Sequence, residues 1–232
     1  MSQRYEQVGV AVTCRSFEEY MRMFDFSEQE LTGRLLDIAG GASSFTADAV
    51  TRKLDAYAAD PRYALDGETL VKEAREEIAA STAKLEKLAD KFDFSYYGGL
   101  ANHRAQREAS LERFAAHIAD PAVRERRYVA GALPKLPFDT DAFDIVLCSH
   151  FLFLYEEQFG HEFHREAVLE MMRVCRPGGT IRVYPIMSLN WTPYAHMDEL
   201  LETIRGQGGS PGFFRSKLPF IPGSELGLFI DL

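Results

Sequence analysis

The sequence is short of cysteine, of basic charge and of long apolar runs. Only three of its 232 residues are cysteines, Cys14, Cys148 and Cys175, and none belongs to a Cys-x-x-Cys pair. Neither a zinc site nor a disulfide framework is expected, and unpaired thiols fit a reducing compartment. The stretch 1–13 lacks a signal-peptide core, and the most apolar stretch, 145–155, is too short to span a bilayer. We expect a cytoplasmic protein that does not enter a membrane.

Basic residues are outnumbered by acidic ones, 26 to 35, and the formal net charge is -9. A protein that binds nucleic acid through phosphates needs a basic face, so this balance disfavours a DNA or RNA partner. Hydrophobic residues make up 46% and charged residues 26% of the chain, as in globular proteins with a packed core. The length predicts a single domain over 1–232, with an N-terminal helical segment at 1–33.

Hydrophobic periodicity predicts strands that alternate with helices. The expected strands are 34–38, 54–59, 127–130, 143–148 and 180–184, and the expected helices are 16–26, one starting near 44, 67–92, 102–118, 162–174 and 196–205. Such alternation is typical of an α/β fold: a Rossmann-like, doubly wound, mostly parallel sheet. Two further strands, 213–218 and 226–230, are expected to form an antiparallel hairpin at the sheet edge. The helical insertion between strands two and three, about 66–125, is longer than a crossover needs and predicts a cap over the open end of the sheet.

A small-residue turn follows the first strand. Asp37 stands near the strand end, and Ala39, Gly40 and Gly41 follow it. Small residues let a ligand approach the backbone, and the next helix offers free N–H groups, although a tight turn alone explains the pattern equally well. Asp60, at the end of the second strand, is placed where Rossmann-type sites carry an acid for ribose hydroxyls. Asp60 followed by Pro61 also fits a turn, but the two features together favour ribose binding.

Two later segments complete an ordered set of four. One runs from 131 to 138 as GALPKLPF and is followed by AFDIV, and the other runs from 170 to 181 as EMMRVCRPGGTI. In order and spacing the four segments, spread over 35–184, resemble the class I methyltransferases that use S-adenosylmethionine, of the small-molecule type. The chain departs from the family pattern at Ala39 and Ser43, where glycine is usual, and at Ala132, where an acid commonly contacts adenine. A methyl group at position 39 is tolerable if the turn keeps an ordinary backbone conformation.

The resemblance implies a cofactor, S-adenosylmethionine, and a set of residues around it. Asp37 would lie near the methionine amino group, Asp60 would hold the ribose, and the backbone of Ala39, Gly40 and Gly41 would contact the cofactor. Adenine recognition would rely on the N–H of Leu133 and on packing from Leu133 and Phe151. Ser149 and His150 would lie beside the sulfonium, and Tyr20 of the N-terminal helix would touch the cofactor.

Methyl transfer needs alignment and exclusion of water, and a general base only where the acceptor holds its proton tightly. His150 is the first candidate base, because it follows the fourth strand at the ligand-binding end of such sheets, and Tyr155 is the second. A histidine that satisfies a backbone carbonyl is an equal alternative for His150. No metal site is expected at His161 and His164, whose spacing is not HExxH and for which no third ligand is evident.

Several alternatives stay open for the rest of the site. Arg104 and Arg107 would bind an acidic acceptor group or, more commonly, form a solvated helix face, and Trp191 and Tyr194 are candidates to line the acceptor pocket. The partner is expected to be a small-molecule acceptor. A protein that binds the cofactor without catalysis is one competing function. A nicotinamide-dependent oxidoreductase is disfavoured because the turn reads AGGASS and not GxGxxG, and a nucleic-acid methyltransferase is disfavoured by charge.

Overall fold

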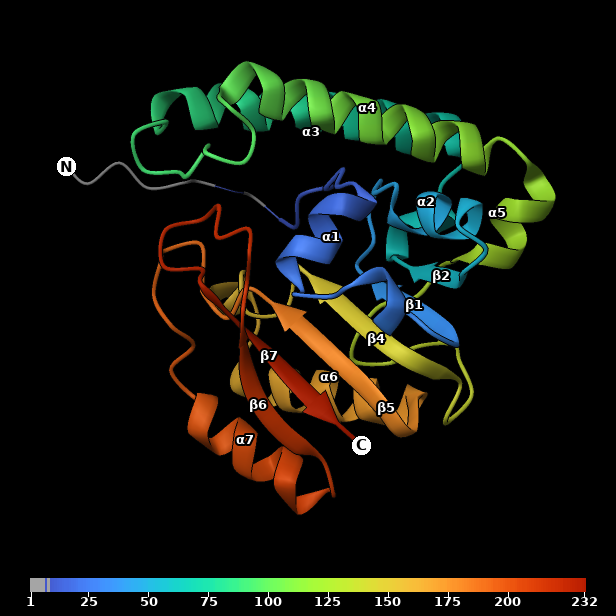
Figure 1. Ribbon diagram of the computed structural model, residues 1–232, viewed down its shortest axis with the longest axis vertical. Coiled ribbons are helices and arrows are strands. Elements are labelled where there is room, and N and C mark those ends of the chain that lie inside the picture. Colours follow the sequence, from blue (N-terminus) through green and yellow to red (C-terminus); the bar gives the residue numbers. More distant parts are fainter. Residues whose placement is uncertain (1–6, 8) are drawn as a thin grey trace.

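The fold is built on one seven-stranded sheet in the order β3-β2-β1-β4-β5-β7-β6. The computed structural model describes residue 7 and residues 9–232 (Figure 1). The strands are β1 (Arg34–Ile38), β2 (Asp55–Ala59), β3 (Tyr128–Val129), β4 (Phe143–Ser149), β5 (Cys175–Tyr184), β6 (Ser210–Arg215) and β7 (Leu226–Asp231). The first five run parallel, and β7 is antiparallel to both of its neighbours, β5 and β6. The predicted fold class is confirmed.

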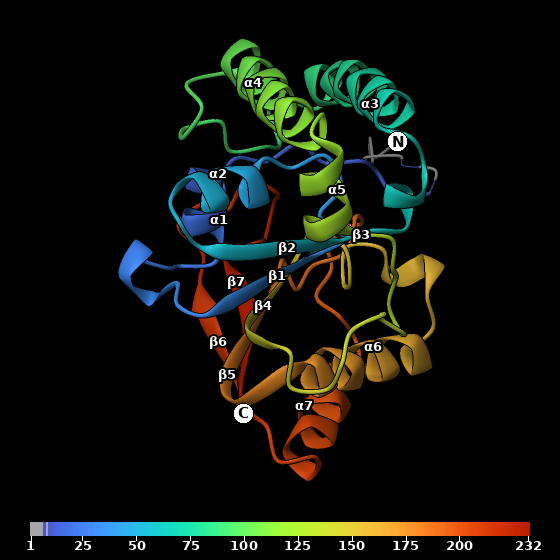
Figure 2. The same ribbon diagram turned by 90° about the vertical axis from the view of Figure 1, so that its right-hand side faces the viewer.

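Helices cover both faces of this sheet (Figure 2). They are α1 (Phe17–Met23), α2 (Phe45–Thr51), α3 (Gly67–Lys87), α4 (Leu100–Ile118), α5 (Pro121–Arg127), α6 (His161–Val174) and α7 (Met197–Gly206). Short 3-10 turns lie at Glu28–Glu30, Pro61–Ala64 and Glu156–Gln158. Ser16 caps α1, and Glu19 completes a capping box with it. Within the described residues, no helix has the length and apolar character needed to cross a membrane.

The two central strands divide their side chains between two cores. Leu36 of β1 and Val146 of β4 pack with α6 and α7, whereas Leu35 and Ile145 pack with α1 and α2. Successive side chains of a strand point to opposite faces, so a strand buried on both faces reads as a continuous apolar run. Asp37 shares its face with Leu35 and therefore points toward α1.

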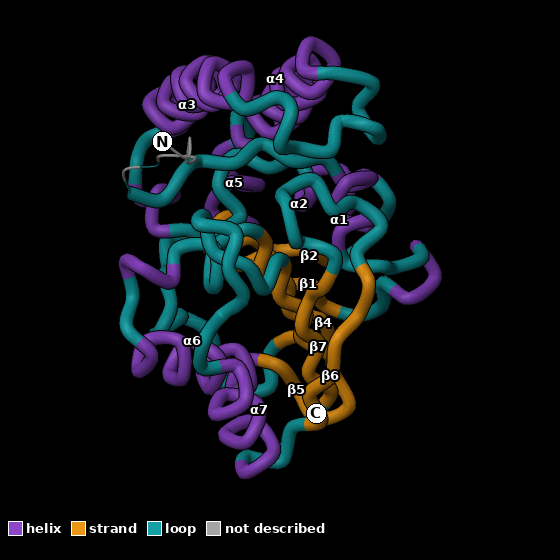
Figure 3. Tube along the Cα trace, turned by 90° about the vertical axis from the view of Figure 1, so that its left-hand side faces the viewer, coloured by secondary structure: helices purple, strands orange, loops and turns teal. Residues whose placement is uncertain are grey.

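The insertion between β2 and β3 contains α3, α4 and α5. Figure 1 shows α3 and α4 as a long antiparallel pair across one end of the molecule, and Figure 3 shows loops gathered between this pair and the strands. A third apolar cluster joins the pair to the extended segment before α1, through residues such as Val12, Ile78 and Phe114. The pair therefore stands over the end of the sheet where β1, β2 and β4 finish.

Element bounds differ from the predicted ones at a few places. The third strand has two residues, since it pairs only with β2 at the sheet edge, and α5 was not predicted. β5 begins at Cys175, five residues before the predicted start, because a register shift opposite β4 lets the strand include residues 176–179. A Cβ on Gly179 would lie 2.6 Å from the carbonyl oxygen of Asp144, so glycine is needed there. The hairpin strand β6 lies at 210–215 and not at 213–218.

Candidate functional site

A cavity of about 330 Å³ lies at the carboxyl ends of β1, β2 and β4, and we call it the strand-end cavity. Ligands of open α/β sheets bind at this edge, where the strand order reverses. Of the eight predicted cofactor residues, four line the cavity: Ala39, Asp60, Leu133 and Ser149. Phe151 and Phe163 supply apolar wall beside Leu133. The other four, Tyr20, Asp37, Gly40 and Gly41, do not line it.

Asp60 presents a carboxylate that is already oriented by backbone donors. Its Oδ2 accepts a hydrogen bond from the N–H of Gly41 at 3.0 Å, and its Oδ1 accepts one from the N–H of Arg62 at 2.9 Å. Burial raises the pKa of Asp60, while the two N–H donors act in the opposite direction. Each carboxylate oxygen can accept a further hydrogen bond, so Asp60 can still bind a pair of hydroxyls.

Asp37 lies behind the glycine turn with Tyr20 directly against it. The Tyr20 hydroxyl is 3.0 Å from both carboxylate oxygens of Asp37, and burial raises the pKa of this carboxyl well above its ordinary value. A Cβ on Gly40 would lie 2.9 Å from Oδ2 of Asp37, so only glycine fits beside the carboxyl. Asp37 and Tyr20 therefore pack beneath the turn and restrict its residues to small ones.

The backbone at Ala39 is left-handed, with φ 57°. The turn therefore lacks the ordinary backbone conformation in which a methyl group at position 39 would be tolerable. The left-handed region places Cβ too close to the following carbonyl oxygen and costs a residue other than glycine about 1–2 kcal/mol. The turn takes this conformation because it has to leave β1 and reach α2 within a few residues. Glycine is usual at such a position for this steric reason.

Ala39→Gly is accordingly expected to raise the free energy of unfolding by about 1 kcal/mol. Glycine removes the backbone strain, and the greater conformational entropy of glycine in the unfolded chain offsets part of that stabilisation. Urea denaturation followed by circular dichroism measures the change. Ala42→Gly in the same turn is the control: Ala42 is buried with an ordinary backbone, so this variant should be less stable. Equal destabilisation by both variants would contradict the strain at position 39.

His150, which follows β4, has a left-handed backbone like Ala39, with φ 51°. Its N–H donates to the carbonyl of Tyr184 at 2.6 Å, and its Nδ1 lies 2.9 Å from Oγ of Ser149. The ring thus binds a side-chain hydroxyl and not a backbone carbonyl, the alternative raised above. Burial, then the charges of Arg15 and Arg107, lower the pKa of His150 well below its ordinary value, so the imidazole is neutral. Strained residues of this kind concentrate at functional sites.

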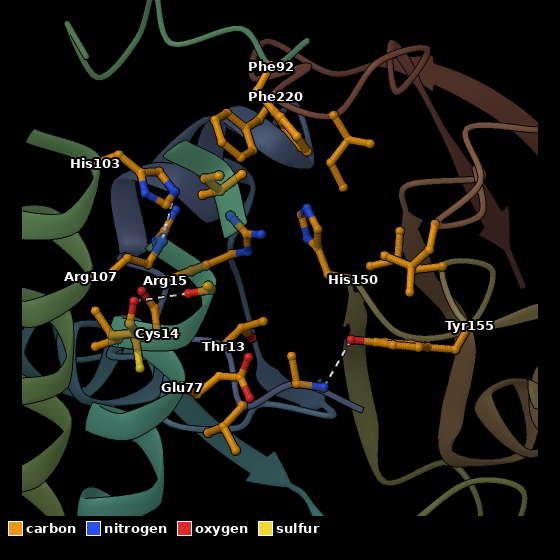
Figure 4. Close-up of a pocket in the computed structure, with 18 of the residues that line it drawn as sticks. Thr13, Cys14, Arg15, Glu77, Phe92, His103, Arg107, His150, Tyr155 and Phe220 are labelled. Atoms are coloured by element: carbon orange, nitrogen blue, oxygen red, sulfur yellow. Dashed lines mark hydrogen bonds between the residues drawn. The ribbon is translucent and has the colours of Figure 1, made fainter. Parts of the chain in front are cut away.

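A second cavity of about 110 Å³ adjoins the first, and His150 lines both. We call it the interhelix cavity, because α3 and α4 form one wall and the segment 11–15 another (Figure 4). Tyr155 lines it, and its hydroxyl accepts a hydrogen bond from the N–H of Ala11 at 3.0 Å. Burial raises the pKa of Tyr155, which makes the phenol a neutral group that helps to hold the segment. Trp191 also lines this cavity, whereas Tyr194 packs in the core beside α6.

A buried ionic network closes one side of the interhelix cavity, and the sequence did not reveal it. Arg107 of α4 donates through Nη1 to Oε2 of Glu19 at 2.7 Å and through Nη2 to Oε1, and Tyr97 donates to Oε1 at 2.6 Å. Glu19 is fully buried and Arg107 is 7% exposed, so the solvated face expected for Arg107 was wrong. Arg104 does lie on a solvated face, paired with Glu108 at 2.8 Å. The serine–glutamate spacing of the capping box was the one available signal for Glu19.

The histidines at the start of α6 have different roles. His164 is buried, with its ring nitrogens 3.0 Å from the carbonyls of Gly160 and Leu152. His161 belongs to a different group, without His164: His161, His196 and Glu199 each offer one possible ligand atom, and these atoms lie within 4.8 Å of one another. The tertiary fold supplies this group from α7, which sequence spacing could not indicate.

Part of the chain is similar to known proteins. Residues 108–183 match the family model described as "Methyltransferase domain". An uncharacterized protein of Methanocaldococcus jannaschii is 28% identical over 194 residues, which cover 83% of this chain and 85% of that protein.

Two solved structures are similar to this chain at low sequence identity. The YcgJ protein of Bacillus subtilis is 16% identical, with a TM-score of 0.48 over 85% of this chain and 70% of that one. A Thermotoga maritima protein described as an S-adenosylmethionine-dependent methyltransferase, possibly acting on histamine, is 14% identical, with a TM-score of 0.46 over 93% of this chain and 88% of that one.

Proposed function

We propose that this chain, whose residues 108–183 match the methyltransferase domain family model, binds S-adenosylmethionine in the strand-end cavity and methylates a small-molecule acceptor. The observation that carries the proposal is the convergence of residues from three strand ends on one cavity. Asp60 follows β2, Leu133 lies in the loop after β3, and Ser149 ends β4, and all three side chains line the same space.

The residues of the strand-end cavity fit the adenosyl part of the cofactor. Asp60 would accept hydrogen bonds from the two ribose hydroxyls, and the apolar wall of Leu133, Phe151 and Phe163 would enclose the adenine. Because Ala132 offers no acid, the adenine amino group would be recognised by shape and backbone. The volume of about 330 Å³ lies at the lower end of the range usual for ligand pockets.

The residues between the two cavities would handle the proton of the acceptor. When bound, S-adenosylmethionine supplies a methyl group activated by positive sulfur. His150 faces both cavities as a neutral imidazole. In the tautomer whose Nδ1–H donates to Oγ of Ser149, its Nε2 would be the atom that accepts a proton. The aromatic side chains of Phe151, Phe163 and Trp191, which line the two cavities, would exclude water from this point. The acceptor would be a small molecule and not a nucleic acid, because the net charge is -9 and the second cavity is narrow.

Asp60→Ala is expected to weaken the binding of S-adenosylhomocysteine about 10- to 100-fold, because it removes hydrogen bonds to an ionised group. Calorimetric titration of the wild type and the variant with S-adenosylmethionine, S-adenosylhomocysteine and NAD measures the change. Asp139→Ala is the matched control, since this aspartate is exposed and lies outside the strand-end cavity.

The outcomes separate the competing functions. Binding of both adenosyl compounds, lost only in Asp60→Ala, supports the proposal, and turnover in an acceptor screen completes it. Tight binding without turnover on any acceptor would favour a non-catalytic binding protein. Binding of NAD alone would favour an oxidoreductase, and binding of none of the three would overturn the cofactor assignment.

A further inference from the structure

Arg15 carries a buried guanidinium with few partners. The residue is 8% exposed, and its Nε and Nη1 are buried without a hydrogen bond. Arg15 lines the interhelix cavity, and Figure 4 shows its side chain extending toward His150. The nearest carboxylate is that of Glu19, at 3.9 Å from Nη1, beyond hydrogen-bond distance.

The neighbouring charges do not satisfy this guanidinium. The carboxylate of Glu19 already accepts hydrogen bonds from Arg107, Tyr97 and the N–H of Ser16. The carboxylate of Glu19 thus stands between two guanidiniums, and only that of Arg107 lies within hydrogen-bond distance of it. Burying an unpaired charge costs several kcal/mol, and arginine keeps its proton under all ordinary conditions. A buried, charged donor without a protein partner needs a hydrogen-bond acceptor from elsewhere, and Arg15 faces a cavity that can hold one.

We propose that Arg15 binds a carboxylate group of a ligand in the interhelix cavity. The inference rests on the proposed function, since either of its small molecules can bring that group: an acceptor with an apolar body, or the amino-acid end of the cofactor. A carboxylate matches the planar guanidinium fork. The carboxylate of Glu77 also lines the cavity, with one oxygen buried and unpaired, and it would repel a doubly charged phosphate more strongly. Phe92, Trp191 and Phe220 would enclose the apolar part of such a ligand.

Arg15→Met and Arg107→Met form a matched pair of buried arginines that differ in their partners. In the ligand-free protein, Arg15→Met is expected to leave Tm unchanged or to raise it, because it removes a poorly compensated buried charge. Arg107→Met is expected to lower Tm, because it breaks the contacts to Glu19. A fall in Tm for Arg15→Met as large as that for Arg107→Met would mean that Arg15 is structural, and would overturn the proposal.

Calorimetry then compares two pairs of ligands, each with and without a carboxylate. S-adenosylhomocysteine is compared with 5′-methylthioadenosine, which lacks the amino-acid end, and 3-phenylpropionate is compared with its amide, both with and without S-adenosylhomocysteine. Arg15→Met is expected to weaken one carboxylate ligand about tenfold or more and to leave its carboxylate-free partner unchanged. A loss confined to S-adenosylhomocysteine assigns Arg15 to the cofactor, and a loss confined to phenylpropionate assigns it to the acceptor.

Three results would count against parts of this account. If Arg15→Met weakens neither carboxylate ligand, the proposal is wrong. Tighter binding of phenyl phosphate than of phenylpropionate would overturn the choice of a carboxylate. If neither adenosyl compound binds the wild type, the proposed function fails, and the phenylpropionate arm still decides the role of Arg15.

Discussion

Replacing Arg107 with methionine is expected to lower the free energy of unfolding by about 3–5 kcal/mol, because removing one partner leaves the buried carboxylate of Glu19 without its main counter-charge. Glu19 is fully buried. Burial alone would raise its pKa, but the charge of Arg107 and its hydrogen bonds hold the pKa at about 2. A carboxyl with a depressed pKa stabilises the folded state above its unfolded pKa of about 4.3, and this contribution is lost as pH falls from there toward 2.

Urea denaturation at pH 7 of the wild type and Arg107→Met measures the loss. Arg104→Met is the matched control, one turn away on the same helix: its ion pair with Glu108 is about half exposed, at 49% for each side chain, and should contribute under about 0.5 kcal/mol. A loss below about 1 kcal/mol for Arg107→Met would show that the network is not what holds α4 against α1.

The free energy of unfolding is expected to fall less on acidification in His103→Gln than in the wild type. His103 is 5% exposed, and burial followed by the charges of Arg107 and Arg15 lowers its pKa to about 3. In the unfolded chain His103 has a pKa of about 6.5 and binds a proton below that pH, whereas in the folded chain it stays neutral down to about pH 3. The free energy of unfolding therefore falls as pH drops from about 6.5 toward 3. At pH 5 this amounts to about 2 kcal/mol from His103. Glutamine keeps an acceptor for the Nε of Arg107, which lies 3.3 Å from Nε2 of His103.

The measurement is the difference in unfolding free energy between His103→Gln and the wild type, at pH 8 and at pH 5. It should move by about 2 kcal/mol in favour of the variant on acidification. Asp37, whose raised pKa acts in the opposite direction, cancels in this difference because both proteins carry it. A difference that is the same at both pH values would contradict the neutral, buried state of His103.

Much of the site near the strand ends could be predicted from local pattern. The apolar runs of β1 and β4 and the acid at the end of β2 place Asp60, Ser149 and His150 at one edge of a parallel sheet, because parallel strands finish together. The conformation of Ala39 could not be predicted, because it depends on how the turn must connect β1 with α2 in three dimensions. Nor could the burial of Arg107, since helix periodicity alone does not tell a solvated face from one that another segment covers.

The sequence by itself determined the α/β architecture, since the alternation of apolar strands and amphipathic helices admits few other arrangements. It also determined the residue types at the strand ends. Only the tertiary structure decided which charges meet. Glu19 and Arg107 are 88 residues apart in the chain, and they pair because the insertion folds back over α1 and the segment that precedes it. The same fold brings Arg15 to a cavity with its guanidinium unsatisfied, and such contacts depend on packing that no local pattern records.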